Sequence, residues 1–171
     1  MDYNEPISNV KWIDVNTLNP NHYNPNVVLT QELNLLKFSI LKTGWIQPIL
    51  ISNDNIIIDG YHRYWLSKND KNIINKYNFY APCCILPLNE CERMLLTVRI
   101  NRAKGNHIAI KMHELISIVY NNYDISIENI GKEIGATIDE VKLLLKEDVF
   151  DALDIKNHKY SMAWIPKTNK N

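Results

Sequence analysis

The first half of the chain alternates short apolar runs with polar breaks rich in asparagine, aspartate and proline. Short apolar runs bounded by turn-forming residues are typical of β-strands. The pattern predicts an opening strand with a turn over residues 8–18, a hairpin of two strands over 48–52 and 55–58, and a further strand over 79–86. Because proline donates no N–H to a ladder, Pro82 predicts that the last strand lies at a sheet edge.

Elsewhere, apolar residues recur at the three- and four-residue spacing of amphipathic helices. This spacing predicts helices over 30–43, 61–68, 90–98, 109–120 and 127–146, the last interrupted at Gly135, and leaves a polar connection before the last strand. The fold class is therefore α+β, a small mixed sheet with helices followed by a helical unit. We expect three parts, residues 1–107, 108–150 and 151–171.

Residues 125–145 have the outline of a helix-turn-helix, with a small-residue turn at Gly135 and Thr137 as the cap of the second helix. Between positions 124 and 148, seven acidic residues outnumber three lysines. Asp139 and Glu140 begin the second helix, where base-reading residues would sit close to phosphates, and their carboxylates should repel a duplex. A structural hairpin or a protein-docking surface is therefore favoured over operator binding.

Composition narrows the function classes. The 171 residues include 19 basic and 19 acidic side chains, so no global field attracts nucleic acid and any DNA binding must be local. No segment approaches the roughly 18 to 20 apolar residues that span a bilayer, and the start of the chain lacks a signal peptide's pattern, which predicts a cytoplasmic protein without membrane contact. Cys83, Cys84 and Cys91 form no C-x-x-C pair, and we interpret Cys83 and Cys84 as packing residues of a strand.

The stretch Asp59-Gly60-Tyr61-His62-Arg63 follows an apolar run and precedes a predicted helix. Glycine permits a tight turn, and the first N–H groups and the dipole of a helix favour an anion at its N-terminus. We therefore predict that Gly60, Tyr61, His62 and Arg63 hold a phosphate group.

Two residues of this stretch could take part in catalysis. Asp59 could hold Mg²⁺ beside a phosphate or orient a nucleophile, but it could equally cap the helix that starts at Tyr61. His62 could donate to a phosphate or act as an acid–base group near neutral pH. We take Asp59 and His62 as the candidate catalytic residues.

Basic residues gather in a second segment, between positions 93 and 113. Arginine offers a bidentate fork to phosphate, and lysine offers a point charge. Within this segment we predict phosphate-binding roles for Arg99, Asn101, Arg102 and Lys104, and we interpret Arg93 and Lys111 as ordinary surface charges. If DNA is bound, the candidate contacts are Lys104, His107, Lys111, Lys132 and Lys142.

Four blocks together resemble the N-terminal domain of the ParB/sulfiredoxin superfamily over about 100 residues. They are an Asn-Pro segment at 19–26, a glycine-to-proline block at 44–51, the turn at 59–63 and an Asn/Arg block at 98–107. The resemblance implies a nucleotide cleft between the turn and the basic segment, with Gln47 and Pro48 also at the site. It further implies ATP or CTP with Mg²⁺, slow hydrolysis by an ATPase or CTPase, and homodimer formation.

Departures from the superfamily's patterns refine this expectation. Sulfiredoxins have cysteine where this chain has Tyr61, so sulfinic acid reduction is not expected. The Asp-Gly-x-His-Arg form is similar to that of the ADP-dependent free serine kinases, for which Glu32 would have to be the base. The segment 160–166, with Trp164 and Pro166, resembles the end of short phage and prophage proteins of the IbrB type. That likeness implies a transcription co-activator with a phosphoadenosine-phosphosulfate-reductase-like partner.

Three hypotheses follow. In the first, the protein is a nucleotide-binding switch whose occupancy controls assembly on DNA or on a partner, as a phage-type regulator would. In the second, it is a small-molecule phosphotransferase that uses the same cleft. In the third, it is a DNA-binding regulator that needs no nucleotide, so that replacing Arg63 would leave DNA binding unchanged.

Overall fold

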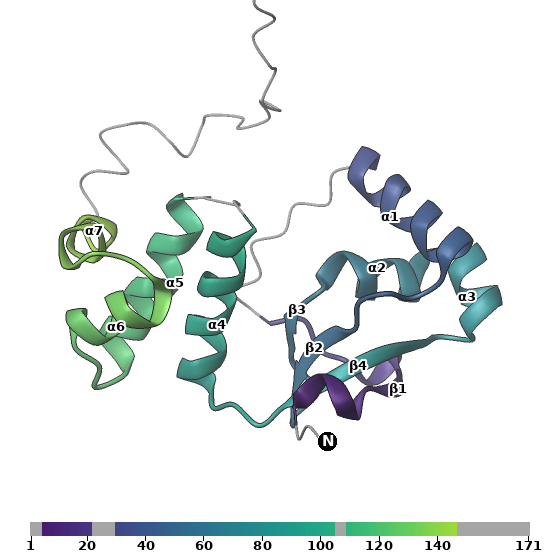
Figure 1. The fold of residues 1–171 in the computed structure, drawn as a ribbon, viewed down its shortest axis with the longest axis horizontal. Coiled ribbons are helices and arrows are strands. Elements are labelled where there is room, and N and C mark those ends of the chain that lie inside the picture. The colour runs from purple at the N-terminus through teal and green to yellow at the C-terminus, as the bar shows by residue number, and fades with distance from the viewer. Residues whose placement is uncertain (1–4, 22–29, 105–108, 147–171) are drawn as a thin grey trace, which may run out of the picture.

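A computed structural model describes residues 5–21, 30–104 and 109–146, and its fold is α+β, as predicted. A four-stranded sheet with three helices lies beside a group of four helices (Figure 1). The expected boundary between residues 107 and 108 and the tail 151–171 fall outside the described residues. No helix within the described residues is both long enough and apolar enough to cross a membrane.

The sheet has the strand order β1-β4-β2-β3. The strands are β1 (Lys11–Asp14), β2 (Ile49–Ser52), β3 (Ile57–Asp59) and β4 (Tyr80–Leu86), and short 3₁₀ turns, η1 (Pro6–Asn9) and η2 (Val15–Thr17), flank β1. β4 is antiparallel to β1 and parallel to β2, and β2 is antiparallel to β3.

The edge position expected for the last strand is wrong, because β4 lies between β1 and β2. Pro82 faces Trp12 of β1 and stands one residue before the parallel pairing with β2 begins at Cys83. Proline at the start of a strand pairing removes a terminal hydrogen bond of the ladder, which disturbs the pairing less than the loss of a central one. Pro82 therefore lies just before the start of the pairing between β4 and β2, and β4 is an inner strand.

Two helices, α2 (Tyr61–Asn69) and α3 (Lys71–Tyr77), pack against the sheet, and α1 (Thr30–Thr43) packs on both of them. Their core includes Leu33, Ile40, Leu66 and Ile73. The polar connection expected between residues 68 and 79 is wrong, since α3 occupies it. The Asp70 carboxylate caps α3 by accepting from the N–H groups of Asn72 and Ile73 at 3.0 and 3.2 Å.

The remaining helices are α4 (Glu90–Ala103), α5 (Ala109–Asn122), α6 (Ile127–Ile134) and α7 (Ile138–Leu144). They enclose a second core built on Met94, Val98, Ile116, Ile130 and Val141. α4 also packs against β3, where the Thr97 hydroxyl lies 3.4 Å from the Ile58 carbonyl oxygen. α4 therefore lies between the sheet and the other three helices (Figure 1).

The helix-turn-helix outline predicted around Gly135 is confirmed by α6 and α7. Ser126 and Thr137 cap the two helices through their side chains, and Gly135 ends α6 in the left-handed region at φ +68°. A Cβ on Gly131 would lie 2.8 Å from the Ala136 carbonyl oxygen. Glycine at position 131 therefore allows the turn to close onto α6.

Candidate phosphate-binding turn

The predicted phosphate turn joins β3 to α2. Gly60 is the N-cap of α2, with φ +96°, and no described side chain caps the helix. Asp59 therefore does not cap α2, and its carboxylate forms ion pairs with Arg63 and Lys104 instead. The N–H groups of Tyr61, His62 and Arg63 remain without a side-chain acceptor at the positive end of the helix dipole.

Arg63 folds back over this turn. Its Nη2 lies 3.1 Å from Asp59 Oδ2, and its Nη1 lies 3.1 Å from Gln47 Oε1. Burial lowers the pKa of Arg63, and the neighbouring Asp59 carboxylate opposes that effect. An arginine retains its proton in proteins, so the turn holds a fixed, partly desolvated positive charge.

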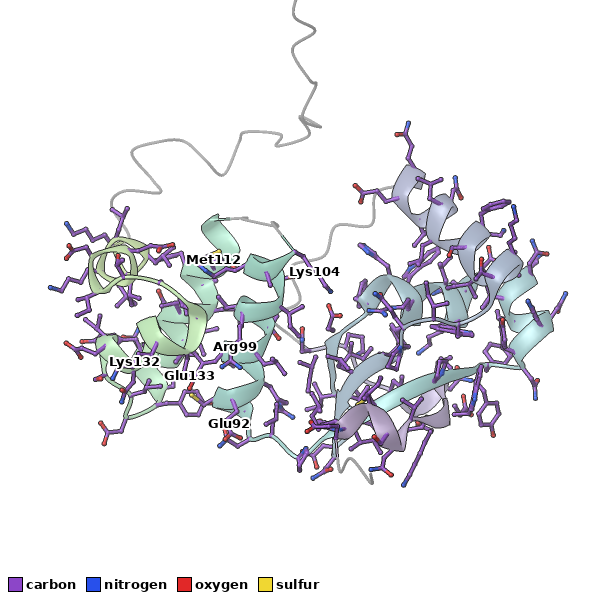
Figure 2. All side chains as sticks on the ribbon, in the orientation of Figure 1. Glu92, Arg99, Lys104, Met112, Lys132 and Glu133 are labelled. Atoms are coloured by element: carbon purple, nitrogen blue, oxygen red, sulfur yellow. The ribbon has the colours of Figure 1, made fainter. Side chains whose placement is uncertain are left out.

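Lys104 reaches the same turn from the end of α4. Its Nζ lies 2.8 and 2.9 Å from the two carboxylate oxygens of Asp59. Figure 2 shows Lys104 at the end of α4, on the side that faces β3. The Asp59 carboxylate is thus held between cations from two separate helices, α2 and α4.

His62 contributes an unsatisfied polar atom in the first turn of α2. Its Nε2 is buried and has no hydrogen-bond partner within the described part of the chain. A buried polar atom without a partner lowers the free energy of unfolding by about 1 to 3 kcal/mol. A ligand that forms a hydrogen bond with this atom would therefore bind more tightly. The Tyr61 ring lies beside it and packs toward the core of the sheet, 5.9 Å from the Tyr64 ring.

Arg99 and Arg102, also predicted to bind phosphate, are placed elsewhere. Arg99 pairs with the carboxylate of Glu133 and donates to its carbonyl oxygen at 2.7 Å. Arg102 donates to Glu140 Oε1 at 2.6 Å and to the Gly135 carbonyl oxygen at 3.2 Å. Figure 2 shows Arg99 and Glu133 together between α4 and α6. The structure therefore brings Lys104 to the turn and directs the two arginines to α6 and α7.

Both carboxylate partners, Glu133 and Glu140, could not be predicted from the sequence. Glu133 and Glu140 lie 34 and 38 residues from the arginines they pair with. No local pattern joins residues that far apart. Their contacts depend on how α6 and α7 pack on α4, which could be found only from the fold.

The interpretation of Arg93 as a surface charge is wrong. Arg93 is only 6% exposed, its Nε has no partner among the described residues, and its Nη1 lies 3.9 Å from Asp54 at the hairpin tip. It shares a face of α4 with Thr97, one turn later, which contacts β3. The packing of this face against the sheet explains the burial.

The other predicted residues are distributed as follows. Gln47 lies at the turn through its bond to Arg63, Pro48 is half-buried just before β2, and Asn101 is half-buried on α4. The candidate DNA contacts Lys132 and Lys142 are exposed on α6 and α7, and Glu32 is exposed on α1. His107 and the side chain of Lys111 lie outside the described residues. Cys83 and Cys84 are buried strand residues, which confirms their packing role.

The described residues contain no cluster of three or more histidine, cysteine or acidic side chains that could hold a metal ion. Magnesium usually takes one or two carboxylates together with substrate phosphates. Asp59 adjoins the uncapped end of α2, but Lys104 contacts both of its carboxylate oxygens and Arg63 contacts one, so it could hold Mg²⁺ only after these cations move.

Comparison with known proteins shows the family of the chain. No family model matches it. Over 168 residues it is 34% identical to the uncharacterized protein YbdM of Escherichia coli strain K12, covering 95% of this chain and 79% of YbdM. The chain belongs to the YbdM family.

The fold of this YbdM-family chain is that of ParB. The C-terminally truncated chromosome-partitioning protein ParB from Caulobacter crescentus, complexed to the centromeric parS site, superimposes with a TM-score of 0.54. The two are 17% identical, and the alignment covers 84% of this chain and 77% of ParB. A structure of the truncated ParB with CTP-gamma-S gives a TM-score of 0.45 at 18% identity, over 85% of this chain and 84% of that one. The superposition on the parS-bound ParB confirms the predicted ParB-like fold.

Proposed function

We propose that this protein is a nucleotide-binding switch in which the turn at Asp59–Arg63 holds the phosphates of ATP or CTP. The observation that carries the proposal is the N-terminus of α2, which Gly60 begins without a side-chain cap, next to Arg63 and Lys104. Backbone N–H groups, a helix dipole and two cations that converge on one point are the usual components of a phosphate site.

The Asp59 carboxylate supports this proposal through its position. It is an internal anion that Arg63 and Lys104 already contact from two helices. A phosphate group bound at the α2 N-terminus would bring further negative charge to the same cations. Asp59 would then be free to hold Mg²⁺ together with phosphate oxygens, and hydrolysis would depend on that rearrangement.

Isothermal titration of the full chain with ATP, CTP, ADP and GTP in the presence of Mg²⁺ tests the proposal. We expect one nucleoside triphosphate to bind, and we expect Arg63→Ala and Lys104→Ala each to weaken binding about tenfold or more, since each removes a charged hydrogen bond. Arg99→Ala is the matched control, because Arg99 pairs with Glu133 and not with the turn. Absence of binding, or equal losses in all three variants, would contradict the proposal.

Association with DNA is the output we propose for the switch. It is supported by the shared fold with a ParB that was crystallised on parS, and by the exposure of Lys132 and Lys142 on α6 and α7. Because Asp139 is exposed at the start of α7, we expect Lys132 and Lys142 to contact phosphates and do not expect α7 to read bases. Retention of a labelled duplex, measured with and without nucleotide, tests this output; retention that nucleotide does not change would contradict it.

Finer assignments remain predictions. The likeness to IbrB-type phage regulators, the reductase-like partner and the role in transcription rest on the resemblance of the sequence. The serine-kinase alternative requires Glu32 as a base, and Glu32 is exposed in the first turn of α1. If the protein forms phosphoserine from serine and ADP, and if Glu32→Ala abolishes this activity, the kinase alternative would be correct and the proposed switch would be wrong.

A further inference from the structure

The outer face of α1 carries two large apolar side chains in adjoining turns. Leu35 is 70% exposed and Phe38 is 60% exposed, which places both among the most exposed large apolar residues of the described chain. Residues three apart on a helix are neighbours, so they form one patch. Single exposed apolar residues are ordinary, but a contiguous patch on a helix commonly marks an interaction site.

The opposite face of α1 is already occupied. Leu33 and Ile40 are buried against α2 and α3, and Lys37 pairs with Asp70 at 2.7 Å. Figure 1 shows α1 at the outside of the molecule, next to α2 and α3. The patch therefore faces away from the sheet and is not needed to attach α1 to its own core.

Opposite charges stand at the two ends of the patch. Glu32 lies one turn before Leu35, and Lys42 lies one turn after Phe38, with its Nζ 5.3 Å from the centre of the Phe38 ring. Both charged residues are exposed. We define the α1 stripe as Glu32, Leu35, Phe38 and Lys42.

This order of charges makes the α1 stripe complementary to itself. In an antiparallel pair of helices related by a two-fold axis, Leu35 meets Phe38 of the second copy, and Glu32 lies beside the Lys42 of that copy. Each contact then occurs twice. We propose that the α1 stripe is the interface of a homodimer, formed by antiparallel packing of α1 against α1 of a second copy, without a requirement for nucleotide.

Analytical ultracentrifugation of the nucleotide-free full chain tests this proposal. We expect a concentration-dependent dimer. Leu35→Glu and Phe38→Glu should each weaken it about thirtyfold or more, because each places a charge at the centre of the apolar contact. Leu143→Glu is the matched control, since Leu143 is an exposed leucine on α7, and it should leave the dimer unchanged. A monomer at every concentration, or a dimer that Leu35→Glu and Phe38→Glu leave intact, would overturn the proposal.

Charge exchange tests the antiparallel arrangement, and it does so with variants that leave the apolar residues intact. Glu32→Lys and Lys42→Glu should each weaken the dimer about tenfold, because each replaces two attractive contacts by two repulsive ones. The double variant restores opposite charges in every contact and should recover the affinity of the original chain. Failure of the double variant to recover would overturn the antiparallel packing of the stripe. Circular dichroism and thermal unfolding confirm that each variant is folded.

Discussion

At the residue scale, the most informative position is Gly60. Four other helices of the described chain begin with a side-chain cap, from Asp70, Asn89, Ser126 and Thr137. α2 begins with a glycine at φ +96° and no side-chain cap. Side chains of the chain itself thus satisfy these four helix starts, whereas the start of α2 stays open next to Arg63 and Lys104.

Gly60→Ala should lower both the stability of the turn and its affinity for nucleotide. A non-glycine residue at this φ costs about 1 to 2 kcal/mol, and the new Cβ would lie 3.1 Å from the Arg63 guanidinium, which must move. Gly44→Ala is the control, since Gly44 has φ +94° but nothing within 4 Å of the added Cβ. We expect both variants to lose similar stability in thermal unfolding, and only Gly60→Ala to lose nucleotide binding. Equal nucleotide affinity in the two variants would contradict the role of Gly60.

At the scale of elements, α4 connects the two cores. It meets β3 through Thr97 and the turn through Lys104. It meets α6 and α7 through Arg99 and Arg102. A ligand that draws Lys104 away from Asp59 would therefore act on the helix that also holds the helix-turn-helix-like unit. This arrangement gives the proposed switch a physical path from phosphate to α6 and α7.

Arg102→Ala should loosen that unit. The Arg102 side chain is 17% exposed and bonds both Glu140 and Gly135, so we expect a loss of about 1 to 2 kcal/mol in the free energy of unfolding. Arg99→Ala should cost less than about 1 kcal/mol, because that side chain is 49% exposed. Denaturant unfolding measures the losses, and hydrogen exchange locates them. Exchange that increases around Gly60 in Arg102→Ala, while α7 stays protected, would show that Arg102 serves the phosphate turn.

At the scale of the whole molecule, periodicity predicted most of the elements and the fold class. α1 has the predicted bounds, and the spacing of apolar residues indicated α5, α6 and α7. α3 was missed because its seven residues are mostly polar, although Asp70 three residues before Ile73 is a cap signal. The glycine turn and the helix after it could be predicted from the sequence, and phosphate binding there stays a prediction. The partners of Arg99 and Arg102 could not be predicted, because ion pairs between helices far apart in sequence depend on packing.

Phosphate binding at the open N-terminus of α2 underlies the proposed switch. Amide spectra of the ¹⁵N-labelled full chain, recorded while a nucleoside triphosphate and Mg²⁺ are added, test it most directly. We expect saturable shifts of the Tyr61, His62 and Arg63 amides, while the Ile73 and Glu92 amides, which Asp70 and Asn89 already cap, stay in place. Unchanged amides at residues 61–63 in the presence of saturating nucleotide would contradict it.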